Sequence, residues 1–325
     1  MFAYILRRLL YAVPILIGVN LLTFALFFVV NTPDDMARLQ LGAKHVTADA
    51  IERWKVEHGY DKPLFLNTQA TGSAQLTDTI FFRHSATMFV FRFGKGDDGR
   101  DIANEIRIRM GPSLAIALPV LVIGLMVNIT FALLMVFFRA TYLDLWGVVL
   151  CVVLMSISGL FYIIAGQYFI AKLWNLLPIS GFAGGINGLR FILLPVLVSV
   201  VAGIGSGSRW YRTIFLEEIG KDYVRTARAK GLSEIRVLFR HVLKNGMIPI
   251  LTGVVVVLPL LFMGSLITES FFGIPGLGSY TIDAIQAQDF AVVRAMVFLG
   301  SFLYIVGLIL TDISYSWVDP RVRLR

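Results

Sequence analysis

The residues that could carry out chemistry in this chain are few, and they do not converge. The sequence contains no phosphate-binding G-x-x-x-x-G-K-[ST], no zinc-binding H-E-x-x-H and no G-x-S-x-G nucleophile turn. Its four histidines are scattered without metal-ligand spacing, and its single cysteine lies inside an apolar run. We therefore expect a non-catalytic chain that holds no metal or cofactor of its own.

The composition is that of a membrane protein. Apolar residues make up 57% of the chain, charged residues only 15%, and the mean hydropathy is +0.76. A soluble domain usually carries about a quarter charged residues. Arg7 and Arg8 precede an apolar run at 9–30 that is longer than the core of a signal peptide and is followed by no cleavage site. This run is therefore predicted to be a retained first span.

Apolar runs of about 20 residues predict transmembrane helices. The chain has six candidates, at residues 9–30, 112–138, 147–171, 189–207, 247–268 and 295–311. If the N-terminus is cytoplasmic, the short loops on its side carry 15 lysines and arginines and the opposite short loops carry 3. Basic residues concentrate on the cytoplasmic side, so both termini are predicted to lie there.

Residues 31–111 are then an external insertion between the first two spans. Residues 47–59 predict an amphipathic helix that begins at the N-cap Thr47, and residues 101–110 predict a helix that ends at a Gly111-Pro112 break. Residues 80–93 are rich in phenylalanine and alternate weakly, which indicates a strand or hairpin, or a segment on the membrane surface. The insertion is predicted to be a small α+β domain.

A basic segment lies between the fourth and fifth spans, at about 207–246. Asp222 suits a helix N-cap, Gly231 suits the left-handed residue that follows a helix, and Ser233 suits a second N-cap. The first of these helices is too short to be stable alone in water. We therefore expect it to dock on another surface.

The sequence of this segment resembles a known motif. Residues 222–232 read Asp-Tyr-Val-Arg-Thr-Ala-Arg-Ala-Lys-Gly-Leu, which resembles the EAA loop of ABC-importer permeases in the version of the dipeptide/oligopeptide (and nickel) permease family. The resemblance implies that the first helix is a coupling helix that binds an ATP-binding subunit. The implied coupling residues are Asp222, Tyr223, Val224, Arg225, Thr226, Ala227, Arg228, Ala229, Lys230 and Gly231. At Ala227 and Gly231 we expect a large side chain to block docking.

Two further stretches are similar to this family. Glu269 is followed by the turn Pro275, Gly276, Leu277 and Gly278, and the C-terminus contains Asp319-Pro320-Arg321. The turn and Glu269 are interpreted either as part of the path, the outer gate or the surface that receives a solute-binding protein, or as a re-entrant turn with helix caps. Asn20 and Asn128 are expected to form interhelical hydrogen bonds. Small residues at 156–159 are expected to serve helix packing, with a pore-lining kink as the alternative.

The resemblance covers the whole chain and implies its organisation. Residues 1–30 would be a cytoplasmic N-terminus and first span, 31–111 an external domain, and 112–325 a type I ABC-importer permease core with five more spans. The chain resembles the first-type subunit, which would pair with a second homologous permease to form half of a path for peptides. Two ATP-binding subunits, which hold ATP and magnesium, and an extracytoplasmic solute-binding protein would complete the importer in the bacterial inner membrane.

Three other functions are weighed against the importer interpretation. A secondary transporter or channel would have no evident use for the basic segment, and an intramembrane enzyme would need a nucleophile motif that the sequence does not contain. Nucleic-acid binding is disfavoured because no aromatic residues are interleaved with the basic ones for stacking. No residue in the spans identifies the cargo.

Overall fold

The chain is mostly helical in the part that the computed structural model describes, which is residues 2–42, 46–185 and 188–318. Among these described residues, five helices are long and apolar enough to cross a membrane, and a sixth candidate span is a bent pair of helices, Tyr142–Ser156 and Gly159–Leu173. The five are Leu10–Val30, Ile102–Phe137, Leu189–Ile219, Glu234–Met263 and Phe290–Ser314. The predicted polytopic α-helical fold is confirmed. The Asp-Pro-Arg tail falls outside the described residues.

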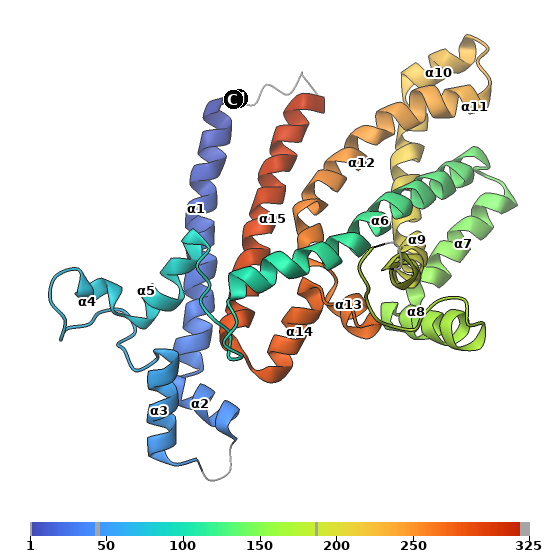
Figure 1. The fold of residues 1–325 in the computed structure, drawn as a ribbon. Coiled ribbons are helices and arrows are strands. Elements are labelled where there is room, and N and C mark those ends of the chain that lie inside the picture. The colour runs from blue at the N-terminus through green and yellow to red at the C-terminus, as the bar shows by residue number, and fades with distance from the viewer. Residues whose placement is uncertain (1, 43–45, 186–187, 319–325) are drawn as a thin grey trace. The chain divides into compact units, whose positions relative to one another are not determined.

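The structure divides into two compact units, Met1–Arg109 with Tyr280–Ile309, and Met110–Ser279 with Leu310–Leu324. The first unit contains the insertion, and Figure 1 colours it from blue to cyan, with its C-terminal part in red. Its elements are α1 (Phe2–Ala25), η1 (Leu26–Val30), α2 (Pro33–Leu41), α3 (Ala48–His58), α4 (Ala74–Thr77), α5 (Ile80–His84), η2 (Ala86–Val90), the first turns of α6 (Ile102–Phe137), most of α14 (Leu277–Ala287) and most of α15 (Phe290–Val318).

The predicted helix at 47–59 is confirmed as α3. The hydroxyl of Thr47 accepts a hydrogen bond from the Ala50 amide, and Gly59 ends the helix in the left-handed conformation with φ +68°. Both ends therefore follow from local sequence signals, since an N-cap hydroxyl and a C-terminal glycine satisfy the unpaired backbone groups of a helix.

The predicted β content of the insertion is wrong. Across the described residues there is no strand, only an isolated bridge between Lys95 and Asp101. The stretch at 80–93 instead forms the short helices α5 and η2, with the Thr79 hydroxyl accepting from the Phe82 amide at the start of α5. A lone hairpin is at best marginally stable, whereas these helices bury Ile80 and Met88.

The predicted break at Gly111-Pro112 is also wrong. The helix begins after Asp101, whose carboxylate accepts from the Asn104 amide at 2.9 Å, and α6 continues through both residues to Phe137. A proline in a helix removes one backbone donor, and transmembrane helices tolerate it because neighbouring groups satisfy the freed carbonyl.

The insertion is attached to α1 and α15 by an aromatic cluster. Phe24 of α1 and Phe28 of η1 pack with Trp54 of α3, Tyr60 and other buried residues. Arg294 of α15 is 2% exposed; its guanidinium lies 4.5 Å from the centre of the Phe28 ring and donates to the Tyr60 hydroxyl at 3.2 Å. The insertion therefore shares one core with the C-terminal end of the first span and the N-terminal part of α15.

The second unit is a bundle around α9 (Leu189–Ile219). Asp144 of α7 (Tyr142–Ser156) accepts two hydrogen bonds from Arg212 of α9, at 2.9 and 2.8 Å, and Asn128 of α6 accepts from the Ser208 hydroxyl at 3.0 Å. The interhelical hydrogen bonding expected of Asn128 is confirmed. The other elements of this unit are α8 (Gly159–Gly166), η3 (Gln167–Leu173), α10 (Asp222–Ala229), α11 (Glu234–Val237), η5 (Leu238–Leu243), α12 (Lys244–Val257), η6 (Pro259–Met263) and α13 (Leu266–Phe272).

Residues 156–159 bend the third predicted span. The angle between α7 and the α8–η3 helix is 88°. Ile157 and Ser158 have extended backbone conformations, with ψ of 130° and 142°, so the hydrogen-bond ladder of the helix is interrupted there. Of the two interpretations of these small residues, helix packing and a kink, the structure shows the kink.

Candidate functional site

The basic segment folds as predicted at its C-terminal end. α10 is followed by Gly231 at φ +77°, whose amide donates to the Arg228 carbonyl at 2.9 Å, while the Leu232 amide donates to the Ala227 carbonyl at 3.4 Å. These two bonds form a Schellman motif, in which a left-handed residue satisfies the last carbonyls of a helix. Ser233 occupies the N-cap position of the next helix, α11, without a side-chain capping bond, and this helix continues into the fifth span as Glu234–Met263.

The N-terminal end of α10 differs from the prediction. Lys221 is the N-cap and Asp222 is the first helical residue. The Asp222 carboxylate still lies where negative charge is favourable, beside the free amides at the start of the helix. The boundary shifted by one residue because the Lys221 backbone, with ψ 150°, supplies the extended conformation of an N-cap without a side-chain bond.

One face of α10 is anchored in the core of the second unit. Val224 is fully buried and Ala227 is 4% exposed. Both join an apolar cluster that α6, α9, α11, η5 and α12 also build, with the buried members Ala132, Leu133, Val136, Phe215, Ile219, Val237, Leu238, Val242 and Ile250. The small side chain of Ala227 therefore lets α10 approach the chain's own core, so a large residue there would disturb this packing. Its effect on the docking of a partner stays a prediction.

The opposite face of α10 is exposed. It carries Asp222, Tyr223, Arg225, Thr226 and Ala229, with Lys230 and Gly231 at its end. The Tyr223 hydroxyl donates to the Glu218 carboxylate, and burial together with this bond raises the pKa of Tyr223 to about 12. Figure 1 shows α10 and α11 at the end of α9 and α12 that is far from α13.

Glu234 ties α10 to two other elements. Its carboxylate accepts from Arg228 at 3.0 and 2.7 Å and from Nη1 of Arg139, in the turn after α6, at 3.1 Å. All three side chains are about one-third exposed. Because a carboxylate that binds two guanidinium groups fixes both of them, this cluster holds the angle of α10 relative to α6 and α11.

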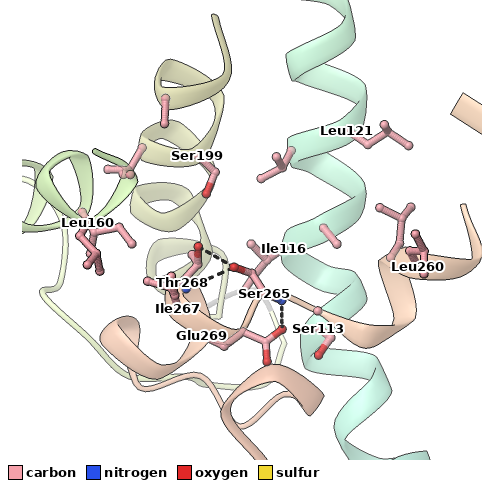
Figure 2. Close-up of a pocket in the computed structure, with 18 of the residues that line it drawn as sticks. Ser113, Ile116, Leu121, Leu160, Ser199, Leu260, Ser265, Ile267, Thr268 and Glu269 are labelled. Atoms are coloured by element: carbon pink, nitrogen blue, oxygen red, sulfur yellow. Dashed lines mark hydrogen bonds between the residues drawn. The ribbon is translucent and has the colours of Figure 1, made fainter. Parts of the chain in front are cut away.

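A cavity of about 620 Å³ lies at the level of the bend between α7 and α8. It is largely apolar, and its polar groups are hydroxyls together with one carboxylate. Figure 2 shows Ser113 of α6, Ser199 of α9, and Ser265, Thr268 and Glu269 of the α13 region around it. The other lining residues are Ile116, Ala117, Val120, Leu121, Ser158, Gly159, Leu160, Ile163, Val198, Ala202, Val257, Leu260, Leu261, Gly264 and Ile267.

Glu269 is 1% exposed and is held by backbone amides. One oxygen accepts from the Ser265 amide at 3.1 Å, and the other accepts from the amides of Gly278 and Ser279 at 2.7 and 3.1 Å. The carboxylate thus caps α14, whose first amide donates to the Ser113 hydroxyl at 2.8 Å. A side chain on Gly276 would collide with the Glu269 carboxylate, which explains the glycine in this turn.

Of the residues predicted for the path or outer gate, only some line the cavity. Glu269 lines the cavity, whereas Pro275, Gly276, Leu277 and Gly278 form the turn behind it and are absent from the lining. Sequence reasoning did not identify Ser113, Glu234 or Arg139. Glu234 follows the N-cap Ser233, where an acidic residue is common, but nothing in the sequence pairs it with Arg139, which is 95 positions away.

No metal centre is found within the described residues: no group of three or more His, Cys, Asp or Glu side chains is placed to hold an ion. Two family models match the chain. Residues 108–324 match the "Binding-protein-dependent transport system inner membrane component" model, and residues 1–84 match the model of the N-terminal region of such membrane components.

Curated relatives match over nearly the whole chain. A Brucella abortus (strain 2308) protein that carries the name of a peptide transport system permease is 30% identical, and the dipeptide transport system permease protein DppB of Escherichia coli (strain K12) is 28% identical. The oligopeptide transport system permease protein AppB of Bacillus subtilis (strain 168) is 26% identical. Each match covers 99% of both chains.

Proposed function

This chain belongs to the family of binding-protein-dependent transport system inner membrane components, and we propose that it forms half of a peptide translocation path and is driven through α10. As a family member it is a multi-pass permease subunit of an ABC importer in the bacterial inner membrane, and ATP hydrolysis takes place in separate subunits. Peptides are the proposed cargo because the relatives are named for peptide, dipeptide and oligopeptide transport.

The observation that supports a coupling role is that one face of α10 is buried and the opposite face is exposed. Its inner face, with Val224 and Ala227, is part of a buried core, and its outer face is exposed. A helix built in this way transmits a push on its outer face to α6, α9 and α12 as a rigid body. We propose that an ATP-binding subunit binds the outer face, Asp222–Ala229, and the Gly231 turn.

The topology and the partners are part of the same proposal. The basic loops support cytoplasmic termini, which would place residues 31–111 on the external side. There this domain would adjoin the solute-binding protein. A second homologous permease would complete the path, and two ATP-binding subunits would bind the two coupling helices. The cavity beside Glu269 would contribute this chain's half of the path, and the 275–278 turn would support the outer gate.

The proposal is tested by reconstitution. The chain, a homologous permease and ATP-binding subunits are co-expressed, purified together and placed in liposomes with the solute-binding protein, and uptake of a labelled dipeptide is followed with and without ATP. ATP-dependent uptake supports the proposal. Purification of the chain alone as a symmetric oligomer that passes solutes without ATP would favour a channel or carrier.

A further inference from the structure

Residues 80–92 of the insertion carry an apolar surface that the protein itself does not cover. We call this stretch, which contains α5 and η2, the phenylalanine segment. Ile80 and Met88 point into the core, but Phe82, Val90 and Phe91 are 41, 65 and 45% exposed. Exposed apolar side chains gathered in one short stretch mark a surface that contacts a partner or a membrane.

Contacts with α1 place this segment beside the first span, well inside its outer end. The side-chain amide of Asn20 donates to the Ser85 carbonyl at 3.3 Å. Asn20 precedes Val30, the last residue of the span, by ten residues, or about 15 Å at 1.5 Å per residue. Leu22 and Val30 are both 73% exposed, so the exposed apolar surface of the first span continues past the level of Ser85.

Contacts with α15 give the same depth independently. The Phe89 ring packs against Phe298 with 5.4 Å between ring centres, and the Phe91 ring packs against Phe302 at 5.1 Å. These partners follow the first residue of α15, Phe290, by eight and twelve residues, or about 12 and 18 Å. The hydrocarbon core of a bilayer is about 30 Å thick, so both spans place the segment within or at the edge of one leaflet.

The charges of the segment fit a lipid surface. Residues 79–93 contain no aspartate or glutamate, and the basic residues Arg83 and Arg92 are both exposed. Arg83 also pairs with Asp78 at 2.7 Å. Long basic side chains extend toward lipid phosphates while neighbouring apolar groups enter the acyl region.

We propose that the phenylalanine segment is a membrane-inserted element: Phe82, Val90 and Phe91 contact the acyl chains of the leaflet beside the insertion, and Arg83 and Arg92 reach the lipid headgroups. Its lipid contact continues the exposed surface of α1 without a gap. The proposal holds whichever side of the membrane carries the insertion, and whichever solute the chain transports.

Spin-label depth measurements test this. In a Cys151→Ala background, which removes the only cysteine, Val90→Cys is labelled with a nitroxide in the full complex in liposomes, and its collisions with oxygen and with a water-soluble nickel chelate are compared. Leu22→Cys on α1 is the lipid reference, and Glu57→Cys, exposed on α3, is the water reference. Phe82→Cys gives a second reading if the first variant does not fold.

The proposal predicts an oxygen-to-nickel collision ratio at Val90 and Phe82 that is close to that of Leu22 and several times that of Glu57. A ratio like that of Glu57 places the segment in water and overturns the proposal. Low collision rates with both reagents place it under another protein and overturn it as well. Peptide uptake by the labelled complexes is measured separately, so loss of transport is not confused with a wrong depth.

Discussion

The guanidinium of Arg228 and the carboxylate of Glu234 form two hydrogen bonds, at 3.0 and 2.7 Å, across the turn that joins α10 to the fifth span. The same carboxylate also binds Arg139 in the turn after α6. Glu234 thus connects α10 with α6 and with the fifth span. We propose that α10 receives the ATP-driven push and that the other two helices move with it.

We expect Glu234→Gln to weaken coupling more than stability. Partly exposed ion pairs contribute about 1 kcal/mol or less, so the unfolding temperature should change little. Both arginines lose their shared anion, so α10 is held less firmly and peptide uptake per ATP hydrolysed should fall. Uptake and ATP hydrolysis are measured together in liposomes, with the exposed Glu217→Gln as a matched control. Equal uptake per ATP hydrolysed in the two variants would argue against a role of Glu234 in holding α10.

The two alanines of α10 should respond differently to a large side chain. Ala227→Trp overpacks the buried cluster, at a cost of about 1–3 kcal/mol, so the solubilised chain should unfold at a lower temperature even without partners. Ala229→Trp projects from the exposed face and should leave that temperature unchanged while it reduces co-purification of the ATP-binding subunit. If Ala229→Trp instead lowers the stability of the isolated chain, the assignment of faces is incorrect.

Glu269→Gln should destabilise the wall of the cavity. The carboxylate accepts three backbone amides in a buried site, and an amide group would turn a donor toward at least one of them. Leaving a buried donor unsatisfied costs about 1–3 kcal/mol. Hydrogen exchange at the amides of Gly278 and Ser279 should accelerate relative to the wild type. Unchanged exchange there would show that the carboxylate does not cap α14.

The insertion should lose stability in mild acid because of His84. Burial, followed by the nearby Arg294 charge, lowers the pKa of His84 to about 3, whereas an unfolded histidine titrates near 6.5. Between these values the unfolded state binds a proton that the folded state does not, so stability falls as pH drops below about 6.5. The Asp97 carboxylate raises the pKa of His58, and that contribution has the opposite sign, since it is lost as pH rises.

Hydrogen exchange of α3 and α5 between pH 4 and 8, corrected for the intrinsic pH dependence of exchange, measures this effect. His84→Phe should flatten the acid side of the profile, whereas His58→Gln, which removes the opposing contribution, should make the acid side steeper. An unchanged acid side in His84→Phe would assign the sensitivity to another group.

Local signals in the sequence predicted the helices around the proposed site. Contacts between residues distant in sequence determine which faces of these helices are buried and where they bend. Gly231 marked the end of α10 because glycine adopts the left-handed conformation readily, and Ser233 marked the N-cap position of α11 although its side chain makes no capping hydrogen bond. The inward orientation of Ala227 depends on Phe215 and Val237, which no short-range pattern connects to it. The bend at Ser158, the cavity and the helical form of residues 80–92 likewise depend on neighbours distant in sequence.

The most direct test of the account places a photo-crosslinking amino acid on each face of α10. At Thr226, on the exposed face, crosslinking should yield an adduct with the ATP-binding subunit in the assembled importer. At Val224, which is buried in the chain's own core, it should yield no such adduct. Adducts of equal yield from both positions, or none from Thr226 in an importer that still hydrolyses ATP and takes up peptide, would contradict coupling through α10.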